Sequence, residues 1–168
     1  MKRLVIIHGP MGVGKSAVCR ELLARTERSV YLDGDWCWNM HPFVVNEENK
    51  AMVLQNIRFL LRSFLQNSGL QTVIFCWVMQ DMSILQSVLE GVSQLAEEVY
   101  VFTLTAEPSN LRARLEKDIR AGLRDAGSLD RALAYLPLYA NMPTVHLSTD
   151  DRSPAAAAEE IARRIGLE

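Results

Sequence analysis

The sequence of 168 residues predicts one α/β domain, with helices covering both faces of a five-stranded parallel sheet. Three observations lead to this prediction. Strand-like runs alternate with segments of helical periodicity along the whole chain. Three of the runs are apolar almost throughout, as in strands buried on both faces. A glycine-rich loop joins the first run to the first helix, at the edge of the sheet where ligands bind in such folds.

The predicted strands are short runs of mostly β-branched, aromatic and other apolar residues. They cover residues 4–8, 30–32, 72–77, 99–104 and 144–147. The first, third and fourth contain few polar residues, which indicates burial on both faces, as in a parallel sheet. The second ends at the acidic sequence Asp33-Gly34-Asp35.

The predicted helices occupy the intervals between the strands. They cover residues 17–25, 46–66, 82–98, 109–123, 129–139 and 155–165. The longest has apolar residues at helical spacing and ends at Asn67-Ser68-Gly69. Asp81 is a candidate N-cap for the third, and Pro108 precedes the fourth. Ser153 as cap and Pro154 at the first helical position mark the start of the last.

The loop after the first strand reads Gly9-Pro-Met-Gly-Val-Gly-Lys-Ser16, which matches the phosphate-binding pattern G-x-x-x-x-G-K-S. Glycines let backbone N–H groups form an anion-holding concavity, and the following helix adds the positive end of its dipole. Lys15 is predicted to reach the β- and γ-phosphates of ATP, and the Ser16 hydroxyl to hold Mg²⁺. The alternative, a chance match in a glycine-rich turn, does not explain the strand before it and the helix after it. The residues expected to contact the cofactor are Gly9, Met11, Gly12, Val13, Gly14, Lys15, Ser16 and Ala17.

Asp33 and Asp35 follow the second strand, at the same edge of the sheet as the glycine-rich loop. Phosphoryl transfer requires a metal held against the phosphates and a carboxylate that orients the acceptor hydroxyl. Two carboxylates separated by one glycine can meet both needs. The alternative interpretation is an ordinary turn, for which Asp and Gly are common residues.

The order of these motifs resembles that of small P-loop kinases. Gluconate kinases and adenylylsulfate kinases carry a very similar Asp-Gly-Asp, and shikimate kinases and chloramphenicol phosphotransferases have a related Asp. The resemblance covers the element order of the whole chain, while its specific motifs lie within about the first 35 residues. It implies the three-layer αβα fold of P-loop nucleoside triphosphate hydrolases with a five-stranded parallel sheet. It also implies that Asp35 is the catalytic base or acceptor-orienting residue, and that Asp33 supports the metal.

By the same resemblance, residues 1–168 form one kinase domain with an acceptor-binding segment at about 36–67. Trp36, Trp38 and Asn39 offer flat apolar surface with polar tips, which suits a ring or sugar acceptor. Packing of these aromatic side chains into the core is an equally open interpretation. Trp38 stands where gluconate kinases place a His, and no basic cluster follows, which argues against gluconate. Two further candidates for the acceptor site are Trp77, with core packing as its alternative, and Arg58, with surface exposure as its alternative.

A basic helix after the fourth strand resembles the segment that carries the mobile lid of small P-loop kinases, expected here at about 115–128. Arg114 matches the arginine that commonly stacks on adenine. Arg120 and Arg124, four residues apart on one expected helix face, are candidates to clamp the phosphates. The alternative is a solvated charged helix. In the loop after the last strand, Thr149 and Arg152 are candidates to border the adenine, and an ordinary helix-capping loop is the alternative.

The amino-acid composition limits the classes of binding partner that we expect for this protein. The net charge is −2, which provides no long-range attraction to nucleic acid or anionic membrane. No apolar run approaches membrane-spanning length. Three widely spaced cysteines form no C-x-x-C pair, which is typical of reduced thiols in a cytoplasmic enzyme. We expect a monomer or a homodimer with a small-molecule acceptor.

The sequence therefore favours an enzyme that uses ATP and Mg²⁺ to phosphorylate a hydroxyl of a small polar metabolite or antibiotic. A strand-end Asp such as motor ATPases use for Mg²⁺ is missing directly after the third apolar run, which argues against a motor or switch protein. Two alternatives stay open at this point. One is a nucleoside or nucleotide kinase. The other is a nucleotide-binding regulatory or resistance protein that transfers no phosphoryl group.

Overall fold

A computed structural model describes residues 1–167 and contains one five-stranded sheet in the order β2-β3-β1-β4-β5. All neighbouring strands run parallel. The strands are β1 (Arg3–His8), β2 (Ser29–Asp33), β3 (Thr72–Trp77), β4 (Glu98–Thr105) and β5 (Val145–Ser148). β1 pairs with β3 on one side and β4 on the other, so it lies at the centre of the sheet, where its residues from Leu4 to His8 are buried. The predicted α/β fold with a five-stranded parallel sheet is confirmed.

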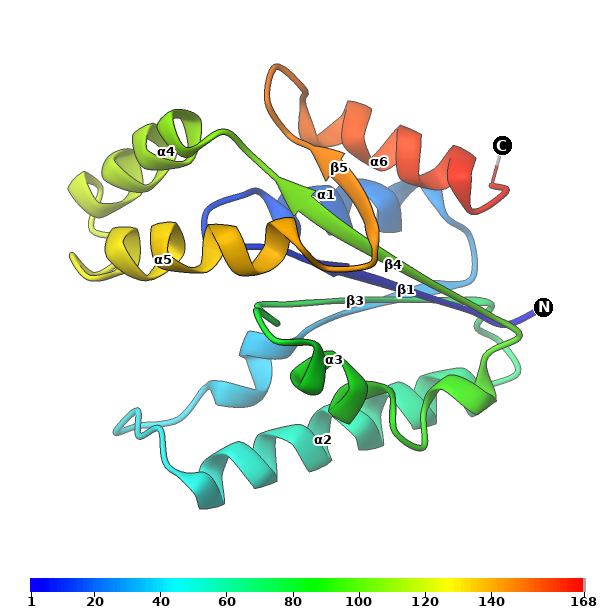
Figure 1. The fold of residues 1–168 in the computed structure, drawn as a ribbon. Helices are drawn as coiled ribbons and strands as arrows, with labels where there is room; N and C mark the ends of the chain where they lie inside the picture. The colour runs from blue at the N-terminus through cyan, green and yellow to red at the C-terminus, as the bar shows by residue number, and fades with distance from the viewer. Residues whose placement is uncertain (168) are drawn as a thin grey trace.

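Helices cover both faces of the sheet (Figure 1). They are α1 (Lys15–Arg25), α2 (Glu47–Gln66), α3 (Met82–Leu89), α4 (Pro108–Arg120), α5 (Ser128–Ala140) and α6 (Pro154–Arg164), with short 3₁₀ helices η1 (Gly34–Trp38) and η2 (Ser93–Leu95). One apolar core joins the sheet to α1, α4, α5 and α6. A second core joins the other face to α2 and α3. These two cores make the three layers of the domain.

Two helices end several residues earlier than the sequence predicts. The helix predicted over 82–98 stops at Leu89, and η2 and the start of β4 occupy the remainder. Gly91 has a φ of 69°, a left-handed conformation that glycine adopts without strain and that ends a helix. The helix predicted over 109–123 stops at Arg120, and Gly122 follows with a φ of 71°. The second of these breaks changes where the predicted lid arginines lie.

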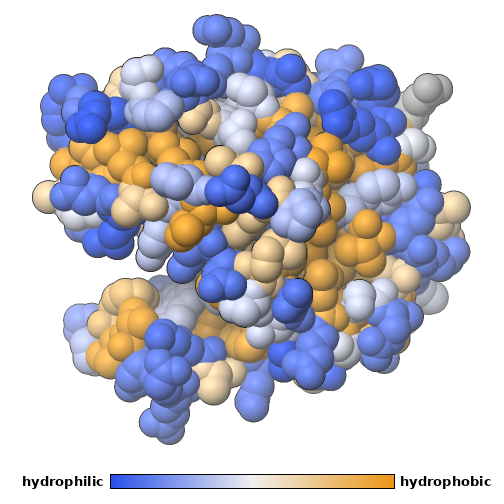
Figure 2. All heavy atoms as spheres, viewed as in Figure 1, coloured by the Kyte–Doolittle hydropathy of each residue, from blue (hydrophilic) through white to orange (hydrophobic). Residues whose placement is uncertain are grey.

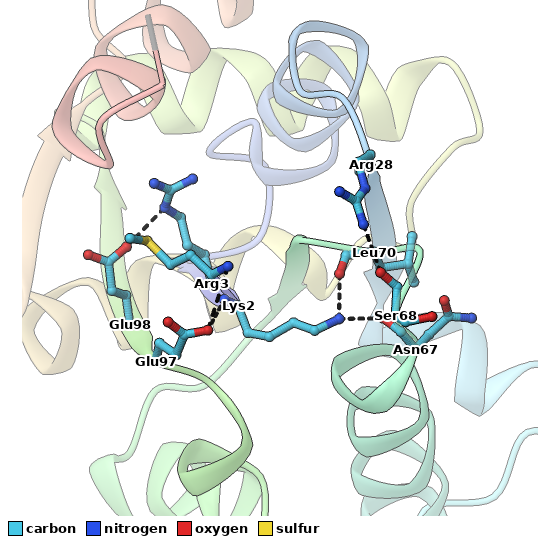
Figure 3. A network of polar contacts seen from close by, with 9 residues as sticks. Lys2, Arg3, Arg28, Asn67, Ser68, Leu70, Glu97 and Glu98 are labelled. Carbon is cyan, nitrogen blue, oxygen red and sulfur yellow. Dashed lines mark hydrogen bonds and ion pairs between the residues drawn. The ribbon is translucent and has the colours of Figure 1, made fainter.

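Polar contacts tie the elements together where the strands begin (Figure 3). The Lys2 ammonium donates hydrogen bonds to the carbonyls of Asn67 and Leu70. Arg28 donates to the carbonyl of Gly69 at 2.9 Å, and Arg3 pairs with Glu98 at 2.9 Å. These contacts join the beginnings of β1, β2 and β4 to the segment that follows α2.

The strands end beside a large hollow. Figure 2 shows it at the left of the molecule, between the part that carries α4 and α5 and the segment that joins β2 to α2. Ligands of parallel α/β sheets bind at this edge. Within residues 1–167, none of the helices is long and apolar enough to cross a lipid bilayer.

Candidate active site

The glycine-rich loop lies between the end of β1 and the start of α1, as the sequence predicts. Gly9, Gly12 and Gly14 all have positive φ values, of 147°, 80° and 107°. A Cβ on Gly9 would lie 2.5 Å from the carbonyl oxygen of Leu104, so only glycine fits there. The Lys15 side chain folds back over the loop and donates hydrogen bonds to the carbonyls of Gly9 and Pro10, both at 2.9 Å. The positive charge of Lys15 therefore lies across the concavity.

A cavity of about 350 Å³ opens over this loop. It is lined by Met11, Gly12, Gly14, Lys15, Ser16, Ala17, Asp33, Asp35, Trp77, Val78, Asp118 and Arg124. The loop and the Asp-Gly-Asp sequence thus meet in one site, although they come from different strands. We call this the phosphate cavity.

Asp33 connects three parts of the site. Its Oδ2 accepts hydrogen bonds from the hydroxyls of Ser16 and Tyr31, both at 2.9 Å, and its Oδ1 accepts one from the backbone N–H of Asp35 at 3.0 Å. The β3 strand ends without a carboxylate, so Asp33 on the neighbouring strand is the acidic group that contacts Ser16. A hydroxyl and one carboxylate suit Mg²⁺, which in nucleotide sites takes its other ligands from phosphates and water.

Asp35 is held by Trp77, whose indole N–H donates a hydrogen bond to its Oδ1 at 3.2 Å. The glycine between the two aspartates makes this contact possible. A Cβ on Gly34 would lie 2.5 Å from Cγ of Trp77, so a larger residue would displace the indole ring. The Asp-Gly-Asp sequence therefore positions one carboxylate on Ser16 and the other under the indole.

The charges in the phosphate cavity influence one another. Burial raises the pKa of Asp35, and the nearby charge of Asp33 raises it further. The Lys15 ammonium, the Trp77 hydrogen bond and Arg124 act in the opposite direction. Burial also lowers the pKa of Lys15. A carboxyl group with a raised pKa is a better proton acceptor than an ordinary aspartate, as a general base requires.

A second cavity, of about 240 Å³, lies on the α6 side of the loop. It contains the predicted Arg114, Thr149 and Arg152 together with Gly12, Val13, Gly14, Val18, Ser153, Pro154 and Ala157. Arg114 donates hydrogen bonds to Oγ1 and the carbonyl of Thr149, both at 2.9 Å, and to the carbonyl of Val13 at 3.3 Å. The guanidinium thus joins the loop to the segment after β5, and Arg114 lines the cavity.

A third cavity, of about 830 Å³, begins at Asp35 on the opposite side of the phosphate cavity. It is lined by Met11, Asp35, Trp36, Trp38, Asn39, Phe43, Val45, Val78, Gln80, Arg131 and Tyr135. Trp36, Trp38 and Asn39 were predicted for this site, and Trp77 lines the phosphate cavity instead. Sequence reasoning missed Arg131 and Tyr135, which come from α5, and nothing in the local sequence marks them. We call this the acceptor cavity.

The prediction that Arg58 faces the acceptor is wrong. Its side chain lies against the end of α3, where it donates hydrogen bonds to the carbonyl of Ser87 and to Glu90. The position of Arg58 on α2 directs its side chain toward α3 and away from Asp35.

The predicted pair of lid arginines is also not on one helix face. Arg120 is exposed in the last turn of α4, and the linings of the three cavities do not include it. Arg124 lies beyond the end of the helix, because the chain turns at Gly122. It folds back to pair with Asp118 at 3.1 Å and lines the phosphate cavity. Of the two arginines, Arg124 is the one in place to contact phosphates.

The chain also matches known proteins. Residues 5–126, from β1 to beyond α4, match the AAA domain family. The chain belongs to this family. Among curated proteins, the chain resembles the cytidylate kinase of Buchnera aphidicola, with 26% identity over 91 residues. That match covers 54% of this chain and 37% of the relative, so the chain spans little more than a third of that kinase.

Solved structures show the same fold over nearly the full length of this chain. The tunicamycin resistance protein of Deinococcus radiodurans is 21% identical with a TM-score of 0.72, covering 100% of this chain and 98% of that one. A sugar kinase from Janibacter is 16% identical with a TM-score of 0.71, covering 99% and 96%. The shikimate kinase of Acinetobacter baumannii, solved with shikimate, is 18% identical with a TM-score of 0.63, covering 98% and 93%. At these identities the likeness establishes the P-loop kinase fold, and the resemblance stated from the sequence is confirmed.

Proposed function

We propose that the protein is a phosphotransferase that moves the γ-phosphoryl group of ATP to a hydroxyl of a small molecule. One observation carries the proposal. Asp35 lines both the phosphate cavity and the acceptor cavity, so a single carboxylate lies where a bound triphosphate and a bound acceptor would meet. Phosphoryl transfer needs a group at this place to orient the attacking oxygen. The small kinases among the solved structures of the same fold support the proposal.

The residues divide the chemistry between them. Lys15 and the loop amides bind the phosphates, and Ser16 and Asp33 would hold Mg²⁺, which neutralises phosphate charge when bound. Asp35 accepts a hydrogen bond from the acceptor hydroxyl and takes its proton as the oxygen attacks phosphorus. The new O–P bond forms, the bond from the γ-phosphorus to the bridging oxygen breaks, and ADP leaves. Arg124 would stabilise charge on the transferring group after it separates from Asp118.

A nucleotide kinase is a second candidate, favoured by the match to cytidylate kinase. A nucleotide acceptor carries a phosphate that needs cationic partners. In the acceptor cavity the cationic side chain is Arg131, and it pairs with Asp125 at 2.8 Å. A third candidate, a nucleotide-binding regulatory or resistance protein, would have no use for the contacts that position Asp35.

Acceptor-dependent ADP release separates the three candidates. Purified protein with ATP and Mg²⁺ is incubated with pooled sugars, nucleosides and aminocyclitol or nucleoside antibiotics, and separately with nucleoside monophosphates. Stimulation by the first pool supports our proposal, and stimulation by monophosphates alone indicates a nucleotide kinase. Lys15→Ala should abolish the stimulated rate, and Asp35→Asn should lower it while ATP affinity stays nearly unchanged. ATP binding without stimulation by any pool would contradict both kinase assignments.

A further inference from the structure

The acceptor cavity continues into a second space that the proposed reaction does not explain. A groove of about 330 Å³ runs from Trp38 between η1, α2 and α3. Its lining is Trp38, Val45, Lys50, Leu54, Trp77, Val78, Gln80, Ser83, Ile84 and Ser87. Trp38, Val45, Val78 and Gln80 line the acceptor cavity as well, so the two spaces share a wall. We call this the apolar groove.

The acceptor cavity and the apolar groove are both more apolar than expected for the binding site of a polar metabolite. Figure 2 shows a hydrophobic patch among hydrophilic residues at the lower edge of the hollow. Trp36 is 54% exposed, Phe43 65% and Val45 56%. Large apolar side chains left in water at the mouth of a cavity favour a ligand that covers them. A ligand restricted to Asp35 and the nearby polar groups would leave the groove empty.

The charges of the two spaces argue against an anionic ligand. Each has one cationic side chain in its lining, and each of these is already paired. Arg131 of the acceptor cavity contacts Asp125 at 2.8 Å, and Lys50 of the groove contacts Glu47 at 2.8 Å. Asp35 adds a carboxylate to the lining of the acceptor cavity. A carboxylate or phosphate on the ligand would lose hydration without gaining a dedicated partner.

We propose that the acceptor is an uncharged amphipathic molecule, with a polar hydroxyl-bearing part at Asp35 and an apolar arm in the groove. The placement of the hydroxyl rests on the proposed function. The placement of the apolar arm in the groove does not depend on the proposed function, because binding measurements alone test it.

The test uses n-alkyl β-D-glucosides, from methyl to octyl, each kept below its critical micelle concentration. Binding to the full chain is followed by tryptophan fluorescence without nucleotide. The chain has three tryptophans, and each lines the acceptor cavity or the groove. Affinity is expected to rise about threefold to fourfold per methylene group until the groove is full, the usual effect of burying one CH₂. An affinity independent of chain length would overturn the proposal.

Two variants of the same helix show where the arm binds. Ser83 is exposed on α3 and lines the groove, so Ser83→Phe fills it from the rim. Gln86 is exposed on α3 outside the groove lining, and Gln86→Phe is the matched control. Ser83→Phe should remove the dependence on chain length, and Gln86→Phe should keep it. A wild-type dependence in Ser83→Phe, with both variants folded by circular dichroism, would place the arm elsewhere and refute the proposal.

The corresponding n-alkyl β-D-glucuronides test the charge argument, because they differ by one carboxylate. They should bind more weakly than glucosides of equal chain length, and equal or tighter binding would refute an uncharged acceptor. These results are independent of catalysis. If no acceptor pool stimulated ADP release while the chain-length dependence held, the proposed function would fail and the groove would stand as a binding site.

Discussion

Replacement of Trp77 by Phe tests whether the indole positions the proposed base. The ring stays aromatic, but the N–H that donates to Asp35 at 3.2 Å is lost. A hydrogen bond to a charged group contributes about 1.5 to 3 kcal/mol, and the length of this one places it near the lower value. If the loss of this bond lets the Asp35 carboxylate leave its place and raises the barrier by about 1.5 kcal/mol, kcat falls about tenfold.

The pH dependence gives an independent readout of the same change. Asp35 must be ionised to accept a proton, so the rate falls as the pH drops through its pKa. Burial and Asp33 raise this pKa, and the Trp77 hydrogen bond lowers it. Removing the bond therefore moves the acidic limb of the kcat profile to higher pH.

Steady-state kinetics across pH, with an acceptor identified by ADP release, measure both effects. Trp36→Phe is the control, because Trp36 lines the acceptor cavity and should change KM more than the acidic limb. An unchanged kcat and an unshifted limb in Trp77→Phe would refute the positioning role.

Three further predictions concern the lid, the loop and the core. Arg124→Ala should lower kcat about a hundredfold. Asp118→Asn should tighten ATP binding severalfold in calorimetry, because it removes a negative charge from the phosphate cavity. Wild-type values in both variants would exclude Arg124 and its partner Asp118 as parts of a lid. Arg114→Ala should weaken ATP binding about tenfold, since its bonds to Thr149 and Val13 shape the second cavity, on the α6 side of the loop, and unchanged affinity would contradict this. Burial lowers the pKa of His8 to about 4 from 6.5, so stability should fall as pH drops through this interval, by up to about 3 kcal/mol in urea unfolding. His8→Gln should lose that dependence, and a slope equal to wild type would assign it to other groups.

The sequence predicts the fold and the phosphate side of the site well, because both depend on local patterns. The glycine-rich loop lies between β1 and α1, and Asp33 and Asp35 lie where β2 ends. β3 lies between β1 and β2, but the carboxyl ends of all these parallel strands meet at one edge of the sheet, which brings the two segments into one site. The contact of Ser16 with Asp33 follows from this geometry.

The acceptor side could not be predicted in the same way. Tyr135 and Arg131 reach the acceptor cavity from α5, about a hundred residues after Asp35, and only the packing of α5 places them there. Arg58 was predicted for the acceptor site but pairs with Glu90 instead, because a helical pattern does not say which neighbour a polar side chain will meet. The position of Arg124 depends on the turn at Gly122 after the end of α4, which helical periodicity in the sequence did not reveal.

Transfer of labelled γ-phosphoryl from ATP tests the central claim most directly. Wild-type protein and Asp35→Asn are incubated with γ-³²P-labelled ATP, Mg²⁺ and the acceptor pools, and labelled small molecules are separated from ATP and inorganic phosphate. We predict a labelled acceptor with wild type and little or none with Asp35→Asn at equal ATP occupancy. An equal yield from Asp35→Asn, or label released by wild type only as inorganic phosphate with every pool, would contradict the account.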